Sequence, residues 1–262
     1  MDLSIVIVNY NSKDKTFFCL NSIYKSNLNG ISFEVIVVDN DSSEKIEEEL
    51  KNKYPSVVFI QSDENLGMGS GNNLGIKNST GKYILILNPD TEVRPNTIKK
   101  LYDYANNDKN IGLIGPKLFY PDGKIQNSCY HFPNLLIPFF RRTFLSKFAK
   151  GYLDYYLMKN TDLSKPLEVD WIMGSCLLVR RSLLDKIGLF DERFFMYFED
   201  TDLCRRIKLS GWKVIYLPSA EVIHHHGRAS AKRHWLIAPF TNRLSRVHIA
   251  SWIKYFLKWR FK

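Results

Sequence analysis

Cysteine is scarce in this chain. The 262 residues include four cysteines, which lie far apart and form no Cys-x-x-Cys pair. This spacing excludes a zinc site built on clustered cysteines, and it excludes the dense disulfide framework of a small secreted domain. We expect the four thiols to be small buried side chains in a reducing compartment.

Long apolar runs are also missing. The longest stretch without a charged residue covers 125–140 and contains two prolines, so it does not span a bilayer as a helix. The apolar run at 3–8 is too short for the hydrophobic region of a signal peptide. We therefore expect a protein that is soluble or peripheral to a membrane.

Acidic residues are absent after Glu221. The net charge is +10, and residues 222–262 contribute nine positive charges and no negative ones, which leaves residues 1–221 close to neutral. A cationic segment of this kind indicates a partner with an anionic surface, either nucleic acid or membrane. Hydrophobic residues make up 45% of the chain and charged residues 24%, which excludes disordered and collagen-like classes.

Short apolar runs alternate with helical patterns in the first half. The runs predict strands at 3–8, 34–38, 57–60 and 83–87, and helices are predicted from about residue 13 and at 44–53. Strands that are apolar on both faces and alternate with helices are typical of a parallel α/β sheet covered on both sides. In the second half we predict a β-hairpin around 121–123, a strand at 169–179, a helix at 199–209 and a strand at 212–217.

Polar residues follow the predicted strands, at the sheet edge where ligands bind in parallel folds. They lie at 9–11, 39–41, 63–65 and 88–90. Asp90 could hold a divalent cation against a diphosphate, because hard cations prefer oxygen ligands. Asn88-Pro89-Asp90 is equally a good turn sequence.

Three further segments could carry chemistry, and each also has a structural interpretation. The carboxylates of 199–202 follow an aromatic run, so one of them could be a general base, or all could complement a helix dipole. His224 could complete a metal site or be an ordinary core histidine. The glycines of 65–75 allow either close approach to a ligand or close helix packing.

Taken together and in order, these segments resemble family 2 glycosyltransferases with the GT-A fold, in particular the bacterial rhamnosyltransferase-like branch. The resemblance covers about residues 3–230, and it implies a Rossmann-like, mostly parallel central sheet flanked by helices. The matching segments are 6–12, 37–43, 65–67, 71–75, 87–91, 188–192, 194–200 and His224 with Gly227 and Ser230.

The resemblance implies a role for each matching residue. Asp200 would be the catalytic base, with Glu199 before it. Asp90 and His224 would bind Mg²⁺ or Mn²⁺, with Asn88 in place of the first Asp of the family's Asp-x-Asp motif. The donor-binding residues would be Asn9, Asn11, Asp39, Asn65, Gly67, Asn72, Asn88 and Asp90. The acceptor would contact Trp171, Asp191 and Glu192.

The resemblance also implies a reaction and its partners. The family is inverting, and the Gln-x-x-Arg-Trp motif of processive synthases is absent, which predicts single sugar additions. The branch implies dTDP-L-rhamnose as donor, with a UDP-hexose or UDP-N-acetylhexosamine as the alternative. The acceptor would be a glycan on a polyprenyl diphosphate, in surface polysaccharide or O-antigen synthesis at the cytoplasmic face of the inner membrane. An alternative of another class is a non-catalytic nucleotide-binding module.

The basic C-terminal end is predicted to be a helical extension, 231–262, of a catalytic domain at 1–230. No nucleic-acid-binding motif is present, so we expect an anionic membrane rather than nucleic acid as its partner. A helix over 245–262 would be either an interfacial membrane binder or an ordinary helix that packs on the core with a solvated lysine face. Its apolar face would hold Ile249, Trp252, Ile253, Phe256 and Trp259, and its lysine stripe Lys254, Lys258 and Lys262.

Overall fold

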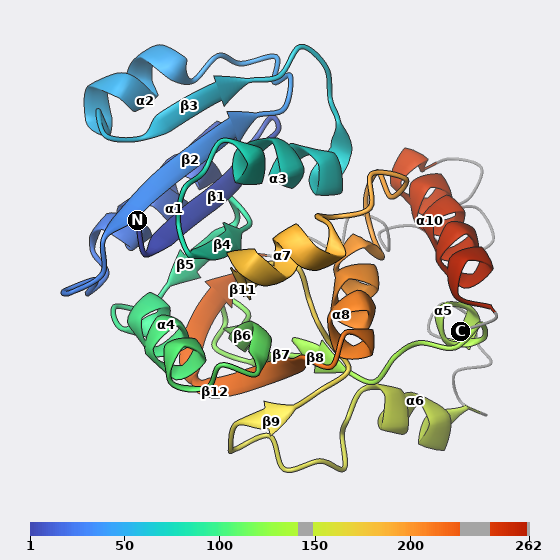
Figure 1. Ribbon diagram of the computed structural model, residues 1–262. Coiled ribbons are helices and arrows are strands. Elements are labelled where there is room, and N and C mark those ends of the chain that lie inside the picture. Colours follow the sequence, from blue (N-terminus) through green and yellow to red (C-terminus); the bar gives the residue numbers. More distant parts are fainter. Residues whose placement is uncertain (141–148, 226–241, 261–262) are drawn as a thin grey trace.

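A ten-stranded mixed sheet forms the centre of the computed structural model, which describes residues 1–140, 149–225 and 242–260 (Figure 1). The strand order is β3-β2-β1-β4-β11-β6-β12-β5, with β7 and β9 paired to β6 and β12. The bounds are β1 Leu3–Asn9, β2 Phe33–Asp39, β3 Val58–Gln61, β4 Tyr83–Leu87, β5 Thr91–Val93, β6 Ile111–Phe119, β7 Ile125–Gln126, β9 Leu167–Glu168, β11 Cys176–Arg180 and β12 Lys213–His224. Two further strands, β8 Cys129–Tyr130 and β10 Trp171–Ile172, pair separately.

The first four strands along the chain are parallel, as their apolar runs predict. β1 pairs in parallel with β2 and β4, and β2 with β3. The register of β1 and β2 places Asn9 opposite Asp39 at the last pair. Two polar residues from distant parts of the chain therefore meet at the carboxyl edge of the sheet.

Helices cover both faces of the sheet, which confirms the predicted α/β architecture (Figure 1). In β1, Ile5 and Ile7 point to one face and Val6 and Val8 to the other, because successive strand residues alternate. The first face is covered by α1 Lys13–Tyr24, α2 Glu47–Lys53 and α4 Thr97–Asn107, and the second by α3 Gly67–Lys77, α7 Arg181–Ile187 and α8 Glu199–Leu209. The remaining described helices are α5 Ile137–Phe140, α6 Lys150–Tyr156 and α10 Arg243–Trp259.

Glycine lets α3 lie close to the sheet. A Cβ on Gly75 would collide with the side chain of Val6, and one on Gly71 would press on Val8. The glycine run therefore serves helix packing along the length of α3. Its first residue, Gly67, has a different role at the site.

Several predicted boundaries are corrected. The single strand predicted at 169–179 is two strands, β10 and β11, because Gly174 donates its backbone N–H to Asp200 instead of to a neighbouring strand. The strand predicted at 212–217 continues as β12 to His224, and the helix predicted at 44–53 begins at Glu47. The predicted hairpin is confirmed as β6 and β7.

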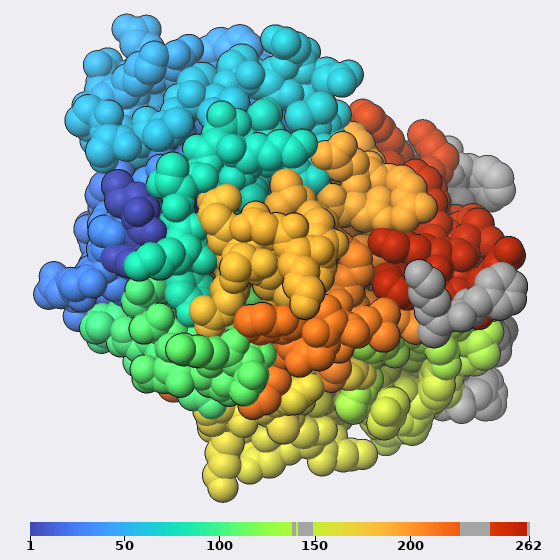
Figure 2. Space-filling view, viewed as in Figure 1, coloured from blue at the N-terminus to red at the C-terminus, as the bar shows by residue number. Residues whose placement is uncertain are grey.

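The C-terminal helix α10 packs against the segment before α8 and against α8 itself (Figure 2). The predicted boundary between 230 and 231, together with Gly227 and Ser230, lies outside the described residues. In the part of the chain that the structure describes, no helix combines the length and apolar character needed to cross a bilayer.

Candidate functional site

Asp39 ends β2 and is held by a buried hydrogen-bond network. Asn9 donates from Nδ2 to Asp39 Oδ2 at 2.6 Å and to Ser42 Oγ at 3.0 Å, while its Oδ1 accepts from Thr16. Asp39 Oδ1 accepts from the backbone N–H of Ser42 at 2.8 Å. Since every polar atom of Asn9 is engaged, Asn9 positions the Asp39 carboxylate.

Asn11 lies on the exposed side of this network. It has φ 48°, and its Oδ1 accepts from the backbone N–H and the hydroxyl of Ser43 at 2.9 and 2.8 Å. Its own N–H donates to Ser42 Oγ. Ser42 thus links three predicted donor-binding residues, Asn9, Asn11 and Asp39, in one cluster at the carboxyl ends of β1 and β2.

Asn40 connects that cluster to the loop before α3. Its Nδ2 donates to Asn65 Oδ1 at 3.1 Å and to the carbonyl of Gly67 at 3.2 Å, and its backbone N–H donates to the carbonyl of Asn9. The predicted residues Asn65 and Gly67 therefore lie beside Asn9 and Asp39.

Gly67 also meets the segment before α8. Its φ is +81°, and a Cβ there would collide with the carbonyl oxygen of Phe195. The next residue, Met68, donates its N–H to that same oxygen at 2.8 Å. Only glycine permits this contact, which joins the predicted donor side to the predicted catalytic segment.

Asp90 and His224 are brought together, as predicted for a metal pair. Asp90 follows β4, His224 ends β12, and Asp90 Oδ1 lies 3.3 Å from His224 Nε2. His224 is buried, and the Asp90 side chain is 21% exposed. Within the described ranges no group of three or more His, Cys, Asp or Glu side chains could hold a metal ion, so the described part of the chain offers Asp90 and His224 as a pair.

The residues present fit a divalent cation. Gln126 Oε1 lies 3.2 Å from His224 Nδ1. Because an amide oxygen accepts, this contact favours the tautomer with its proton on Nδ1 and a lone pair on Nε2. An imidazole lone pair and a carboxylate oxygen then face each other, and both are ligands that Mn²⁺ and Mg²⁺ sites use.

The short segment Gly174-Ser175 connects Asn88, two residues before Asp90, to the candidate base Asp200. Ser175 accepts through its carbonyl from the N–H of Asn88 at 2.9 Å, and Gly174 donates to Asp200 Oδ2 at 2.8 Å. Asn88 Oδ1 and Ser175 Oγ are buried without a hydrogen-bond partner among the described residues. Unpaired buried polar atoms are costly, and a polar ligand would satisfy them.

Asp200 is fixed in the first turn of α8. Besides Gly174, it accepts from the backbone N–H of Thr201 at 2.6 Å. Burial raises the pKa of Asp200, and the hydrogen bonds from Gly174 and Thr201 oppose that rise. A carboxylate with a raised pKa in a fixed orientation is suited to accept a proton.

Glu199, the residue before Asp200, has the more strongly perturbed carboxyl group. Burial, and after it the charge of Asp200, raises the pKa of Glu199 to about 8. Its Oε2 is buried without a partner among the described residues. The two neighbouring carboxyl groups thus do not ionise independently, since each charge disfavours the other.

The predicted acceptor residues are placed differently from one another. Asp191 accepts hydrogen bonds from Arg193 and from Lys258. These bonds hold the pKa of the Asp191 carboxyl group far below its usual range, and those from Arg193 have the largest effect. Glu192 is half exposed and accepts from Asn73. Trp171 is buried, stacks on Tyr130 with ring centroids 4.4 Å apart, and donates from Nε1 to the carbonyl of His131. An acceptor contact stays a prediction for all three.

The two neighbouring asparagines of α3 make different contacts. Asn72, predicted to bind donor, donates to the carbonyl of Met68 in its own helix at 2.9 Å. Asn73, which sequence reasoning missed, donates to the carbonyl of Phe190 and accepts from its N–H. Asn73 therefore fixes the 188–192 segment against α3.

Four other residues to which the sequence assigned no role hold predicted site residues in place through hydrogen bonds. Asn40 and Ser42 follow Asp39 by one and three residues, and the segment that holds them was singled out without a role for either residue. Gly174 and Gln126 carried no local signal, because their partners Asp200 and His224 are 26 and 98 residues away along the chain.

Comparison with solved structures defines the class of fold. The chain superposes on GalNAc-T7 with UDP, GalNAc and Mn²⁺ with a TM-score of 0.66 and 17% identity, covering 85% of this chain and 43% of that one. It superposes on the mannosyltransferase PcManGT from Pyrobaculum calidifontis, in complex with GDP-Man and Mn²⁺, with a TM-score of 0.64 and 16% identity, covering 98% and 64%. The chain thus spans less than two thirds of each of these proteins. This likeness defines the class of the fold, which is GT-A.

The family follows from the sequence comparison. Residues 4–188 match the model of glycosyl transferase family 2, and the chain belongs to that family. It is 33% identical over 217 residues to an N-acetylglucosaminyl-diphospho-decaprenol L-rhamnosyltransferase of Mycobacterium tuberculosis, covering 76% of this chain and 68% of that protein. It is 28% identical over 267 residues to rhamnosyltransferase WbbL of Escherichia coli, covering 98% and 93%. The predicted resemblance to rhamnosyltransferase-like members is confirmed.

Proposed function

We propose that this chain is an inverting transferase that moves one sugar from a nucleotide-sugar to a hydroxyl of a lipid-linked glycan, with dTDP-L-rhamnose as donor. The observation that carries the proposal is the direct connection of Asn88 to Ser175 and of Gly174 to Asp200. Two adjacent residues thereby join the predicted diphosphate side of the site to the predicted base.

Asp200 takes the proton from the acceptor hydroxyl while the hydroxyl oxygen attacks the anomeric carbon of the donor. The nucleoside diphosphate leaves from the opposite face of the sugar, so the anomeric configuration inverts. The hydrogen bonds from Gly174 and Thr201 keep the carboxylate oriented for this transfer. No covalent intermediate on the protein is required.

Asp90 and His224 would hold Mg²⁺ or Mn²⁺, which supplies positive charge against the diphosphate of the donor. The solved neighbours that contain Mn²⁺ with UDP or GDP-Man support this assignment. Asp39, oriented by Asn9, would bind the nucleoside, with Asn11 and Asn65 at the rim of the same pocket. Asn88 would give a neutral contact.

The named activities of relatives support the donor and the acceptor. Two of them are rhamnosyltransferases, and the mycobacterial one acts on a decaprenol-linked substrate. Another relative, named as a protein of O-antigen biosynthesis in Myxococcus xanthus, supports the pathway. A UDP-hexose or UDP-N-acetylhexosamine donor is the second candidate, because a hexosyltransferase of Haloferax volcanii is 31% identical. With such an acceptor, the protein would act at the cytoplasmic face of an anionic membrane.

The test is a panel of sugar nucleotides with Mn²⁺, in which turnover of the wild-type protein is compared with that of Asp200→Asn. We expect dTDP-L-rhamnose to be consumed fastest, and we expect Asp200→Asn to lose at least about 10²-fold in kcat with nearly unchanged donor affinity. The matched control is Asp185→Asn, since Asp185 lies on α7 at the protein surface. Near-normal turnover by Asp200→Asn would refute the base. Binding of a nucleotide without any turnover by the wild-type protein would favour the non-catalytic module.

A further inference from the structure

Lys258 of the C-terminal helix α10 points toward the body of the protein. Lys258 Nζ lies 2.6 Å from Asp202 Oδ1 and 2.7 Å from Asp191 Oδ2, and its side chain is only 18% exposed. Trp259 donates from Nε1 to the same oxygen of Asp202 at 2.9 Å. The predicted solvated lysine face is therefore wrong for Lys258.

The buried residues of α10 are small or polar for the most part. They are Ser245, Ser251, Tyr255 and Trp259. Ser251 donates to the carbonyl of Met196 at 2.8 Å, and Arg205 of α8 donates to the Tyr255 hydroxyl at 3.2 Å. Polar contacts and two aromatic rings thus attach α10 to the molecule, and no aliphatic side chain of the helix is buried.

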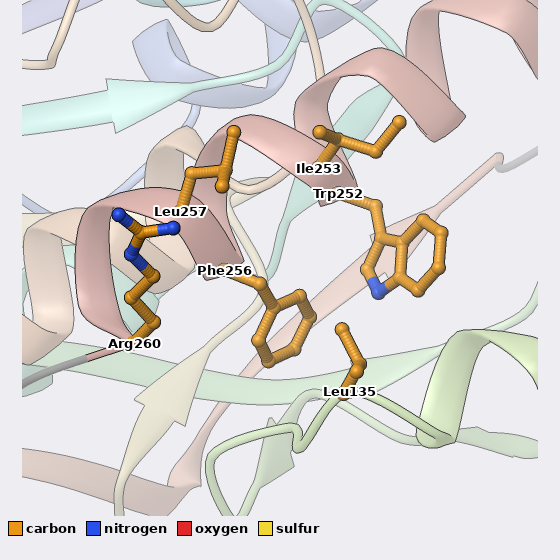
Figure 3. Close-up of a pocket in the computed structure, with 6 residues that line it drawn as sticks. All are labelled: Leu135, Trp252, Ile253, Phe256, Leu257 and Arg260. Carbon is orange, nitrogen blue, oxygen red and sulfur yellow. The ribbon is translucent and has the colours of Figure 1, made fainter.

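The outward side of α10 carries two exposed large aliphatic side chains among exposed basic ones. Ile253 is 47% exposed and Leu257 is 57% exposed. Trp252 and Phe256 extend from the helix toward Leu135 of the neighbouring segment, and Arg260 closes one end (Figure 3). These six residues line a groove of about 270 Å³, and the adjacent Leu136 is 50% exposed.

We propose that this groove and the Ile253–Leu257 side of α10 insert into the surface of an anionic lipid bilayer. Exposed aliphatic and aromatic side chains on a helix rich in arginine and lysine are the features of an interfacial helix. Charge complementarity favours lipid over an apolar protein partner, because residues 222–262 carry nine positive charges and no negative one. Arg260 lines one end of the groove and adds a positive charge there.

This insertion deepens the proposed function and rests on it for the nature of the acceptor. α10 contacts the segment just before Asp200: Lys254 donates to the carbonyl of Arg193, and the ring of His248 packs 4.8 Å from that of Tyr197. A membrane bound by the outer side of α10 would thus lie next to the catalytic segment. A lipid-linked acceptor needs this placement.

The experiment is flotation of the purified full chain with vesicles of phosphatidylcholine and phosphatidylglycerol in roughly equal parts. The variant Ile253→Gln with Leu257→Gln removes the apolar side without changing charge. The control Ile125→Gln with Leu209→Gln alters two aliphatic residues that are each 64% exposed elsewhere on the surface. We expect the first variant to bind vesicles about tenfold more weakly and the control to bind as wild type does.

Equal flotation of the two variants, or no flotation of the wild-type chain, would overturn the inference. The wild-type chain could instead be a dimer in solution and the Ile253→Gln, Leu257→Gln variant a monomer, while both float with vesicles equally. That result would overturn the inference and assign the groove to a second copy of the chain. Donor hydrolysis without vesicles is measured in parallel and should be equal in all three proteins. Its absence in the wild type would count against the proposed function and leave the flotation result to decide the insertion.

Discussion

At the residue scale, Glu199 and Asp200 form a pair whose charges compete. The folded protein raises the pKa of Glu199 from 4.5 to about 8, chiefly by burial and then by the charge of Asp200. A carboxyl group whose pKa is higher in the folded state stabilises the fold at pH values below its unfolded pKa. That stabilisation is lost as pH rises through the folded pKa.

Glu199→Gln should therefore stabilise the protein at high pH, because the amide resembles the protonated acid and cannot ionise. We expect the free energy of unfolding of the variant to exceed that of wild type by about 1–2 kcal/mol at pH 9, with the gap closing toward pH 4.5. Urea denaturation at both pH values measures it. The control is Glu48→Gln, the same change at an exposed side chain in the first turn of α2. A constant difference between Glu199→Gln and wild type at all pH values would contradict the assigned shift.

At the scale of the element, α10 is tied into the turn that precedes α8. Tyr197 and Phe198 both have positive φ, 71° and 67°, a backbone conformation that costs energy for large side chains and persists where neighbours impose it. Ser251 bonds to Met196, and the ring of His248 packs on both aromatic residues. The helix thus contributes to the position of Glu199 and Asp200.

Lys258→Met tests this role, because it keeps the length of the side chain and removes its charge. Asp202, fully buried, retains Arg206 and Trp259 as partners, so we expect a loss of about 2–3 kcal/mol in unfolding free energy. We also expect a several-fold lower kcat with little change in donor KM. The control is Lys254→Met, because the Lys254 side chain is exposed and donates to the backbone carbonyl of Arg193 instead of to a buried carboxylate. If both variants lost the same stability and kcat, the ion pair with Asp202 would have no special role.

At the scale of the whole molecule, the proposed metal pair joins distant strands. Asp90 follows β4 and His224 ends β12, with most of the sheet's second half between them along the chain. A ligand that binds both residues stabilises the folded state as a whole by mass action, by about 2.7 kcal/mol at a concentration one hundred times its Kd.

Mn²⁺ added with a nucleotide-sugar donor should thus raise the Tm of the wild-type protein, and Asp90→Ala should lose the metal-dependent part of that rise. Thermal unfolding with donor, in Mn²⁺ or in a chelator, measures the difference. Asp122→Ala, in the exposed turn between β6 and β7, is the control and should respond as wild type does. An equal donor-induced rise in Tm with and without metal, in all three proteins, would refute the metal pair.

Local pattern was sufficient to predict much of this architecture. β1, β2 and β4 are buried on both faces, so their apolar runs are continuous and unambiguous. Asp39 and Asp90 could be chosen because polar residues after such strands lie at one sheet edge. The helix predicted at 199–209 matches α8, since acidic residues mark its first turn and a glycine follows its end.

Other features depend on contacts that no local window contains. Gly174 interrupts a strand because its N–H is taken by Asp200, and Gln126 orients His224 from a hairpin 98 residues away. The two interpretations of the C-terminal helix could not be separated by its amphipathic pattern. Asp191 and Asp202, placed by tertiary folding, draw Lys258 inward and leave Ile253 and Leu257 outside. The sequence by itself determined the sheet and its polar edge, because burial sets those patterns locally, whereas long-range ion pairs and hydrogen bonds decided which way each functional element faces.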